Sequence, residues 1–294
     1  MNYLETYAYF LRSKIAADRP LRVVFDASNG VTGLVLKDVF NKGEIEPFII
    51  NDEIDPEFSA HGPNPLAQGA ALDCQRAVKE NSAACGVIFD ADGDRAIFVD
   101  EKGRVVPSYV IAVLLFKHGK PPFVADELIY QSLKLLRLAE SVIPSPVGAH
   151  YVKEAMRTND ASFGAEFSGH FYFEDFFFQD SGIVAAIHVI NILSECDVTL
   201  SQFWDNLPRF ILTYDEVSLT SRTWMEIEPF ILDLYAKKAQ DVGKRDGVTL
   251  SLHNQWINIR PSNTEPLLRM TAGGESEKDN LVLIQEIKNL VSKK

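Results

Sequence analysis

Short apolar runs alternate with helix-patterned segments through most of the chain, and this alternation limits the fold more than any other feature. The runs LRVVFD, EPFIIND and CGVIFD predict buried strands, and PPFVAD, SVIP and SFGAEF predict three more after about residue 120. Helical spacing predicts helices among them at residues 3–15, 31–40, 67–80, 127–139, 152–158 and 183–193. Such alternation is typical of α/β domains with a largely parallel sheet. We therefore predict two three-layer α/β/α domains with mixed, largely parallel sheets.

Local signals refine this pattern. AIFVDEKGRVVP predicts a strand, a tight turn and a second strand, and the aromatic run FYFEDFFF is strongly β-prone. Asp180 and Ser181 are candidate N-caps for the helix at residues 183–193.

From about residue 211 the pattern changes to that of a small α+β domain. Residues 225–239 have helical spacing, VTLSLHN, WINIRPS and LLRMTAG predict strands, and a terminal helix of mixed charge follows. We place the three predicted domains at residues 1–118, 119–209 and 210–294.

Composition excludes some classes of protein. The formal net charge is −12 and the pI is near 5.0, so we expect no nucleic-acid partner and no membrane partner, since both require a basic face. The three cysteines have no CxxC spacing, which favours a reducing compartment over a disulfide framework or a zinc site. The first 20 residues carry charges within their apolar run, unlike a signal peptide. We expect a cytoplasmic protein.

The segment FDADGDR carries three carboxylates directly after a predicted strand. Asp90, Asp92 and Asp94 alternate along the loop, so they are close enough to bind one hard cation, and Gly93 lets the loop turn tightly. Oxygen ligands alone select Mg²⁺, Mn²⁺ or Ca²⁺ over zinc. Arg95 is suited to bind a phosphate that also touches the metal.

Two other interpretations of this loop are weaker. An EF-hand also has acidic residues at its first, third and fifth positions, and Glu101 would be its twelfth residue. However, Arg95 occupies the sixth position, where that loop requires glycine, and the flanking segments are strands. A solvated acidic turn without a metal is the second alternative.

The segment NIRPSNTEPLLR is a candidate phosphate site after a strand. Two guanidiniums, the hydroxyl and amide side chains and the backbone N–H groups of a turn can hold a dianion. The residues concerned are Arg260, Ser262, Asn263, Thr264 and Arg269. A capped turn entering a strand is an equally good interpretation of these residues alone.

The segment GAEFSGH places Glu166, Ser168 and His170 at alternate positions between glycines. A carboxylate, a hydroxyl and an imidazole on one face would suit the vicinal hydroxyls of a sugar. A glycine-bounded strand end with solvated polar residues explains the segment equally well. We interpret Ser28 and Asn29 as turn formers, and the remaining histidines as structural or surface residues: His61, His118, His188 and His253.

Taken together and in this order, FDADGDR, GAEFSGH and RPSNTEP closely resemble the metal, sugar-selecting and phosphate-clamp motifs of the α-D-phosphohexomutases, the phosphomannomutase/phosphoglucomutase family. FDASNGVTG resembles the opening strand and turn of that family's second domain, and HGPNPL the stretch before its metal-domain helix. The resemblance covers nearly the whole chain.

The resemblance implies a reaction and a role for each motif. It implies Mg²⁺ at Asp90, Asp92 and Asp94, and Arg95 against the phosphoryl group of a catalytic phosphoserine. It implies interconversion of mannose or glucose 1-phosphate and 6-phosphate through a 1,6-bisphosphate. Sugar hydroxyls would bind at Glu166 and Ser168, with His170 beside them, and the phosphate that is not transferred would bind at Arg260, Ser262, Asn263, Thr264 and Arg269.

The sequence departs from the family in one large respect. A serine in a TASHNP-like motif carries the phosphoryl group in that family, and no such motif occurs in these 294 residues. Ser59, in FSAHGPNP, lies in surroundings that match the second-domain loop instead. We therefore expect domains two to four of the family, with weak or no turnover by the chain alone. A non-catalytic sugar-phosphate-binding remnant and one subunit of a split mutase, completed by a separate serine-domain chain, are the alternatives.

Two smaller differences from the family lie in the domain predicted at residues 119–209. The sequence reads VGAH where many relatives read VGH, so that Ala149 takes the usual histidine position and His150 follows it. Asp126 and Glu127 stand where some relatives have a lysine. Either departure is a candidate for altered substrate contacts.

Overall fold

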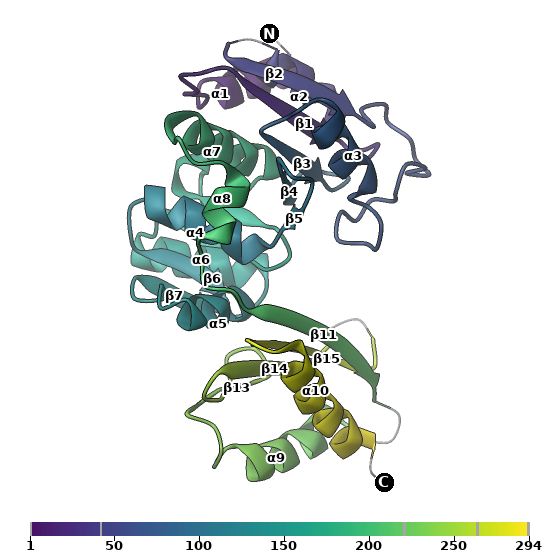
Figure 1. Cartoon of the computed structure of the whole chain (residues 1–294), viewed down its shortest axis with the longest axis vertical. Coiled ribbons are helices and arrows are strands. Elements are labelled where there is room, and N and C mark those ends of the chain that lie inside the picture. Colours follow the sequence, from purple (N-terminus) through teal and green to yellow (C-terminus); the bar gives the residue numbers. More distant parts are fainter. Residues whose placement is uncertain (1, 42, 220–221, 263–264, 293–294) are drawn as a thin grey trace. The chain divides into compact units, whose positions relative to one another are not determined.

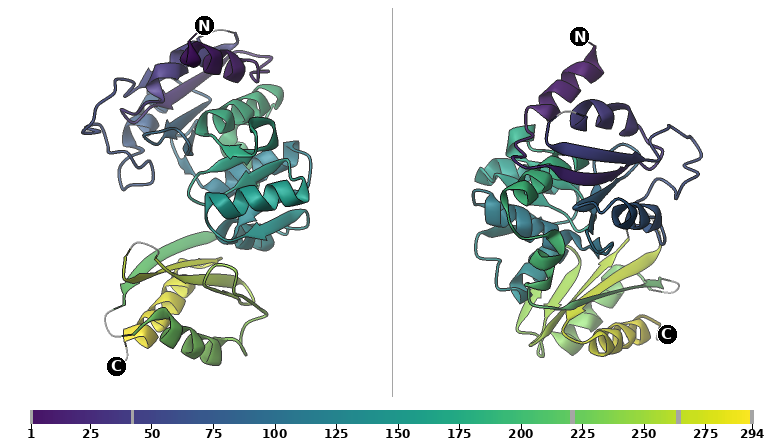
Figure 2. Two further views of the ribbon diagram at one scale, coloured as in Figure 1. Left: turned by 180° about the vertical axis from the view of Figure 1, so that it is seen from behind. Right: turned by 45° about the horizontal axis from the view of Figure 1, so that its top comes forward.

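The computed structural model describes residues 2–41, 43–219, 222–262 and 265–292 and divides into two compact units (Figures 1 and 2). The first unit comprises residues 1–125, 141–143 and 148–207. The second comprises residues 126–140, 144–147 and 208–294. Three five-stranded sheets follow one another along the chain, two mixed and one antiparallel. This confirms the predicted fold class, whereas the boundaries proposed at residues 118 and 209 stay predictions.

The first sheet has the strand order β2-β1-β3-β4-β5. Its strands β1 to β3 are parallel, and β4 and β5 are antiparallel to their neighbours. The strands are β1 (Leu21–Asp26), β2 (Ile45–Ile50), β3 (Cys85–Phe89), β4 (Ala96–Asp100) and β5 (Val105–Val106). The helices of this region are α1 (Tyr3–Arg12), α2 (Gly33–Phe40), α3 (Leu72–Glu80) and α4 (Ser108–His118).

Burial on both faces explains why these strands are continuous apolar runs. All five residues of β3 are buried, and α3 packs Cys74 and Val78 against Val24 and Ile88. On β1, Phe25 stacks on Phe40 of α2 with ring centroids 4.2 Å apart. Because β1 and β3 are parallel, their carboxyl ends reach the same edge of the sheet. The loop with the three carboxylates therefore begins beside the loop that follows β1.

The second sheet has the strand order β10-β9-β8-β6-β7. Strands β6 and β8 are parallel, and β8, β9 and β10 pair antiparallel. The strands are β6 (Phe123–Asp126), β7 (Val142–Ser145), β8 (Phe163–Ala165), β9 (Phe171–Phe173) and β10 (Gln179–Asp180). The helices are α5 (Glu127–Leu135), α6 (Ala149–Asn159), α7 (Gly182–Glu195), α8 (Leu200–Asp205) and the 3₁₀ turn η1 (Glu174–Phe176).

Helix α7 connects the two mixed sheets within the first unit. It contacts β3 and β4 of the first sheet and β9 of the second, and it carries no charged residue before Glu195. A helix that is apolar all round is typical of a buried position. Its N-cap is Ser181, whose Oγ accepts a hydrogen bond from the backbone N–H of Val184 at 3.2 Å, as the sequence predicted.

The structure corrects the predicted extent of several elements. Only Phe171–Phe173 of the β-prone run is a strand, because the chain then turns through η1 and pairs β10 back onto β9. Phe177 and Phe178 adopt left-handed φ angles of 60° and 58° in this reversal. The helix predicted at residues 67–80 begins only at Leu72. Helix α4 gave no sequence signal because it is buried from Ser108 to Leu115 and so has no polar face to mark a helical period.

The third sheet is antiparallel and has the strand order β11-β15-β14-β13-β12. Its strands are β11 (Ile211–Ser218), β12 (Asp241–Gly243), β13 (Val248–Ser251), β14 (Gln255–Pro261) and β15 (Leu267–Gly274). Helices α9 (Trp224–Tyr235) and α10 (Glu277–Ser292) pack Ile231 and Ile287, both fully buried, onto Ile257 and Met270 of the sheet. This is the predicted α+β domain.

Helix α5 belongs to the second unit, although its neighbours in sequence form the second sheet. It contacts β14 and β15, and the fully buried Glu127 accepts a bond from Nη1 of Arg245 at 2.6 Å. Nε2 of Gln131 donates to the other oxygen of Glu127 at 2.9 Å. Asp126 is the N-cap of the helix and accepts from the N–H of Ile129 at 2.8 Å. Both acidic residues therefore have partners within the protein, and their predicted effect on substrate contacts stays a prediction.

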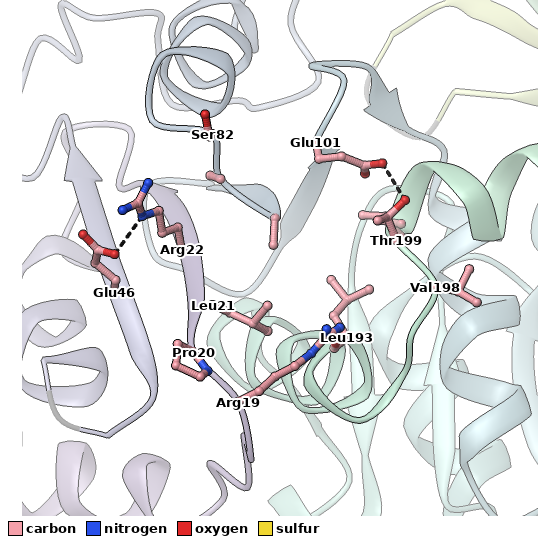
Figure 3. A pocket seen from close by; sticks show the side chains of 13 residues that line it. Arg19, Pro20, Leu21, Arg22, Glu46, Ser82, Glu101, Leu193, Val198 and Thr199 are labelled. Carbon is pink, nitrogen blue, oxygen red and sulfur yellow. Dashed lines mark hydrogen bonds and ion pairs between the residues drawn. The ribbon is translucent and has the colours of Figure 1, made fainter.

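A cavity of about 480 Å³ lies near the amino ends of the strands of the first sheet (Figure 3). Its polar side chains already have partners in the protein. Arg19 donates to the carbonyl groups of Leu193 and Cys196, Arg22 pairs with Glu46 at 2.8 Å, and Glu101 accepts from Thr199. The cavity is at the opposite edge from the carboxylates, and it is not part of the candidate site.

We predict that Arg245→Ala destabilises the second unit by about 2–4 kcal/mol, because it leaves the buried carboxylate of Glu127 without its counter-charge. The matched control is Lys134→Ala on the same helix. Its partner Asp241 is 61% exposed, so the loss should be below about 1 kcal/mol. Hydrogen exchange of the β13–β15 amides measures both changes, and equal losses would contradict a special role for Glu127.

Candidate functional site

The carboxylate loop joins β3 to β4, and its three aspartates converge. One oxygen from each of Asp90, Asp92 and Asp94 lies within 4.8 Å of the others, as one cation would require. Asp90 is buried and Asp92 is exposed. The φ angle of Gly93 is +80°, which confirms the expected tight turn.

Arg95 and the backbone hold Asp90 in place. Oδ1 of Asp90 accepts from the N–H groups of Gly93 and Arg95 at 3.0 and 3.1 Å. Oδ2 accepts from Nε of Arg95 at 2.6 Å. Burial works to raise the pKa of Asp90, but hydrogen bonds from Asp94 and Arg95 lower it overall. Asp90 is thus a carboxylate in a fixed orientation.

Asp94 is the carboxylate that most needs a cation. Burial first, and then the neighbouring Asp90, raise the pKa of Asp94 to about 7. Its Oδ1 is buried and has no hydrogen-bond partner among the described residues. A carboxyl group in this state is stabilised by a proton or a metal ion. The donor set consists of carboxylate oxygens, so it fits a hard cation such as Mg²⁺.

The segment GAEFSGH forms the tight turn between β8 and β9. The N–H of Glu166 donates to the carbonyl of His170 at 2.9 Å, and the N–H of Gly169 donates to the carbonyl of Glu166 at 3.0 Å. The predicted strand end therefore runs directly into a turn, and sugar binding by its three polar side chains stays a prediction. Glu166 and His170 face each other across the turn, and Ser168 lies partly exposed within it.

Glu166 is buried and has two protein partners. Its Oε1 accepts from the N–H of Gly148 at 2.6 Å, and its Oε2 accepts from the hydroxyl of Tyr172 at 2.5 Å. Burial and the adjacent Glu166 raise the pKa of Tyr172, so the phenol stays a donor. These contacts fix the carboxylate beside the N-terminus of α6. The sequence analysis did not predict Tyr172 or Gly148 as partners of Glu166. Its only signal close to either residue was the segment VGAH, which contains Gly148.

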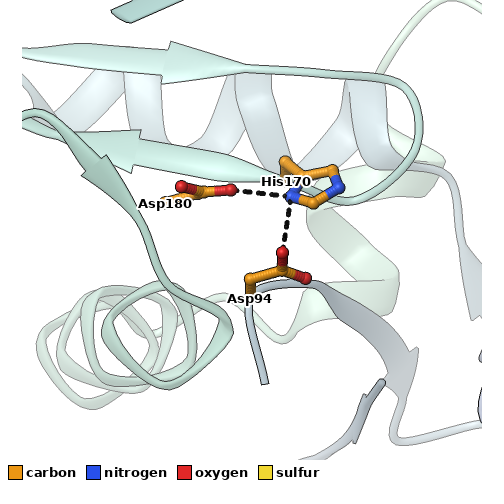
Figure 4. A group of neighbouring side chains, drawn as sticks. All are labelled: Asp94, His170 and Asp180. Atoms are coloured by element: carbon orange, nitrogen blue, oxygen red, sulfur yellow. Dashed lines mark hydrogen bonds and ion pairs between the residues drawn. The ribbon is translucent and has the colours of Figure 1, made fainter. Parts of the chain in front are cut away.

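His170 lies between two carboxylates (Figure 4). Its Nδ1 is 3.0 Å from Oδ2 of Asp180 and 3.8 Å from Oδ2 of Asp94. Burial works to lower the pKa of His170, but the hydrogen bond with Asp180 and the charge of Asp94 raise it overall. Nζ of Lys153 is 2.9 Å from Oδ1 of Asp180. Asp180 was predicted only as a candidate N-cap, and its partner His170 is ten residues away.

The backbone joins the loop of the three aspartates, the candidate metal loop (residues 90–95), to the turn at residues 164–170, the candidate sugar loop, within the first unit. Arg95 and His170 form an isolated antiparallel bridge, and the N–H of Ala96 donates to the carbonyl of Gly169 at 3.0 Å. The N-terminus of α7 adds the bond from Gly182 N–H to the carbonyl of Gly93 at 2.9 Å. A side chain at residue 182 would place its Cβ 2.4 Å from the carbonyl oxygen of Arg95. Only glycine permits this approach.

The turn after β1 supports the metal loop from the other side. Ser28 and Asn29 have φ angles of 52° and 56°, which confirms them as turn formers. The hydroxyl of Ser28 donates to the carbonyl of Phe89 at 2.5 Å, directly before the first metal-loop aspartate. The fully buried Asp26 accepts from the N–H of Ser28 at 3.0 Å, and its Oδ1 lies 3.2 Å from Nε2 of His61.

The candidate phosphate residues lie in the second unit. Arg260 on β14 and Arg269 on β15 are directly opposite in register, and Glu216 on β11 is opposite Arg269. Nε of Arg269 is 3.2 Å from Oε1 of Glu216, and Nε of Arg260 is 3.6 Å from Oδ2 of Asp246. Like charges directly opposite are destabilising, so these arginines need the nearby acids or an anion. The N–H of Ser262 donates to the carbonyl of Leu267 at 2.9 Å, and Asn263 and Thr264 lie outside the described residues.

The histidine of the segment VGAH, His150, is exposed to solvent. Ala149 is the first residue of α6. His150 is 82% exposed, and its Nε2 lies 3.7 Å from Oε2 of Glu154 on the same helix. His150 therefore does not replace a histidine beside Glu166.

This fold and loop arrangement define a multidomain α/β protein with a hard-cation loop next to a histidine-bearing turn. Family models of phosphoglucomutase/phosphomannomutase match in order: alpha/beta/alpha domain II at residues 1–103, alpha/beta/alpha domain III at 131–210 and the C-terminal domain at 225–290. The chain belongs to the phosphoglucomutase/phosphomannomutase family.

Individual relatives agree with this assignment. A phosphomannomutase of Methanocaldococcus jannaschii is 30% identical over all of this chain and 66% of its own length. A phosphomannomutase of Salmonella typhimurium is 31% identical over 85% of this chain and 58% of its own length. The chain thus spans about two thirds or less of these relatives.

Solved structures share the fold. A phosphoglucomutase/phosphomannomutase family protein of Burkholderia thailandensis matches 99% of this chain and 64% of its own chain, with a TM-score of 0.84 and 23% identity. An N-acetylphosphoglucosamine mutase of Aspergillus fumigatus, in complex with GlcNAc-6P and magnesium, matches 99% of this chain and 70% of its own chain, with a TM-score of 0.71 and 15% identity.

Among the described residues no helix has the length and apolar character needed to cross a membrane.

We predict that the His61 contact makes the stability of the first unit depend on pH. The hydrogen bond with Asp26 raises the pKa of His61 above its usual 6.5, and the charge of Asp73 adds to this. The stabilisation is therefore complete below pH 6.5 and is lost as the pH rises through the higher pKa of the folded protein.

Urea unfolding of the wild type and of His61→Gln across this pH range measures the effect. The difference in unfolding free energy should shrink as the pH rises. His150→Gln is the control, since that side chain is exposed and should not change the profile. Parallel pH profiles for the wild type and His61→Gln would contradict the prediction.

Proposed function

We propose that this chain supplies the metal-binding, sugar-binding and phosphate-binding domains of a Mg²⁺-dependent phosphohexomutase that interconverts hexose 1-phosphate and 6-phosphate through a 1,6-bisphosphate. The observation that carries the proposal is the backbone bridge between Arg95 and His170. It brings a cation loop, a guanidinium and a carboxylate–imidazole pair to one place in the first unit. A cation and a guanidinium can offset the charge of a transferring phosphoryl group, and an imidazole can accept the proton of the attacking hydroxyl.

Each group has a chemical task in this proposal. Asp90, Asp92 and Asp94 would hold Mg²⁺, which when bound offsets negative charge on a phosphoryl group. Arg95 has its Nε bonded to Asp90, so its remaining N–H groups can donate to phosphoryl oxygens. His170 can accept the proton of a sugar hydroxyl, because Asp180 and Asp94 stabilise the resulting imidazolium.

In this proposal the sugar and the second phosphate would bind to different residues. Glu166 and Ser168, next to His170, are the proposed partners of the sugar hydroxyls. Arg260 and Arg269, opposite each other in register, would bind the phosphate that is not transferred, together with Ser262, Asn263 and Thr264. The proposed substrate class is mannose or glucose phosphate, because two relatives are phosphomannomutases and the matching family models describe phosphoglucomutase/phosphomannomutase. The Aspergillus structure with a hexosamine 6-phosphate and magnesium supports the wider class of hexose phosphates.

Two other candidates follow from the absence of a TASHNP-like motif in the printed residues. One is a sugar-phosphate-binding protein without turnover, and the other is one subunit of a mutase completed by a separate serine-domain chain. The intact acidic loop favours a role that still uses the metal. Both candidates predict no turnover in a mutase assay of the chain alone with Mg²⁺ and glucose 1,6-bisphosphate, so this assay tests them together. Robust turnover would show that another residue carries the phosphoryl group.

We predict that the chain binds glucose 1-phosphate or mannose 1-phosphate and that Arg260→Ala weakens this binding at least about tenfold, since a charge-assisted contact to phosphate is lost. Calorimetric titration with and without Mg²⁺ measures the affinities. The control is Arg222→Ala in the same unit, where the guanidinium stacks on Phe230. Unchanged affinity in Arg260→Ala would contradict the phosphate site.

We predict that Asp92→Asn weakens Mg²⁺ binding by about tenfold or more, because it removes the exposed carboxylate of the cluster and leaves the fold intact. Titration of Mg²⁺ against the full chain measures this change. Glu80→Gln, an exposed acidic position on α3, is the control for general charge effects. Equal weakening in both variants would argue against a defined metal site.

A further inference from the structure

The loop at residues 51–71 has no helix or strand in the structure, yet one of its side chains reaches the candidate site. Oδ1 of Asn64 lies 3.3 Å from Nη1 of Arg95. We propose that Asn64 is a positioning residue that fixes the plane of the Arg95 guanidinium. The inference rests on the proposed function only for what Arg95 binds.

Arg95 needs two contacts to be fixed. The bond from Nε to Asp90 Oδ2, at 2.6 Å, holds the inner end of the guanidinium. Without a second acceptor, only the partial double-bond character of the Nε–Cζ bond opposes the rotation that exchanges the two Nη groups. Asn64 supplies that acceptor as a neutral amide oxygen. It leaves the positive charge of the guanidinium uncompensated on this side, so the charge stays available for an anion.

Asn64 is itself held in a rigid place. Its Oδ1 also accepts from the N–H of Leu66 at 3.1 Å, and its carbonyl accepts from the N–H of Ala67 at 3.0 Å. Pro63 and Pro65 flank it and restrict the backbone to a narrow range of φ. Pro65 is buried and so fixes the segment against the protein.

The rest of the loop is fastened to the turn that supports the metal loop. Nε2 of His61 lies 3.2 Å from Oδ1 of Asp26. The N–H of Ala60 donates to Oδ1 of Asn29 at 3.2 Å, and the N–H of Asp55 donates to the carbonyl of Asn29 at 3.1 Å. The same turn contacts Phe89 through Ser28. Both this loop and the loop of the three aspartates therefore contact the turn that follows β1. These contacts fix the position of Asn64 relative to Arg95.

Three variants separate positioning from a simple turn-forming role. Asn64→Asp keeps an acceptor for both Leu66 and Arg95. Asn64→Ser keeps the turn, because a hydroxyl can accept from the N–H two residues on, but it is too short to reach Arg95. Gln68→Ala changes an exposed side chain of the same loop and is the control.

The first measurement needs no ligand. The rotation rate of the Arg95 Nη groups about the Nε–Cζ bond is measured by NMR in the full chain. We expect rotation about fivefold faster in Asn64→Ser, as for the loss of one hydrogen bond, and close to the wild-type rate in Asn64→Asp and Gln68→Ala. An unchanged rate in Asn64→Ser would reduce Asn64 to a turn former and overturn the inference.

The second measurement tests the consequence for binding. With Mg²⁺ present, Asn64→Ser should bind glucose 1,6-bisphosphate about three- to tenfold more weakly than the wild type, and Gln68→Ala should bind it equally well. Faster rotation with unchanged affinity would overturn the functional part of the inference. If the wild type does not bind the bisphosphate, the proposed function fails, whereas the rotation rates still decide whether Asn64 positions Arg95.

Discussion

The close approach of the N-terminus of α7 to the metal loop is the constraint on which the rest of the site depends. Gly182 donates to Gly93 at 2.9 Å, and its missing side chain leaves space for the carbonyl of Arg95. Because α7 also contacts strands of both mixed sheets, this approach fixes the sugar-loop turn against the metal loop. The bridge between Arg95 and His170 follows from it.

Side chains of like charge lie close together at two places, one in each unit. In the first unit, three carboxylates lie within reach of one cation, and burial together with the neighbouring Asp90 raises the pKa of Asp94. In the second unit, Arg260 and Arg269 lie opposite each other with acids on either side. The carboxylates of the first unit could be compensated by a cation, and the arginines of the second unit by an anion.

The fold class and most of the strands along the chain could be predicted from the sequence because periodicity is local. The buried helix α4 could not, since a helix without a polar face leaves no period. The end of β9 at Phe173 could not either, because the reversal through η1 depends on pairing with β10. Helix α5 was predicted as a helix, but its association with the third sheet depends on the long-range pair of Glu127 and Arg245.

The sequence by itself determined the three aspartates of the metal loop, since residues two apart on one loop are neighbours in any fold that has this turn. It also determined the types of side chain in the candidate sugar and phosphate segments. Only the tertiary structure decided which of these groups meet. The packing of β9, β10 and α7 brings His170 next to Asp94 and Asp180. The contacts of the loop at residues 51–71 with the turn after β1 bring Asn64 next to Arg95. Such contacts join residues that are far apart in the chain, and their distance is set by packing rather than by spacing.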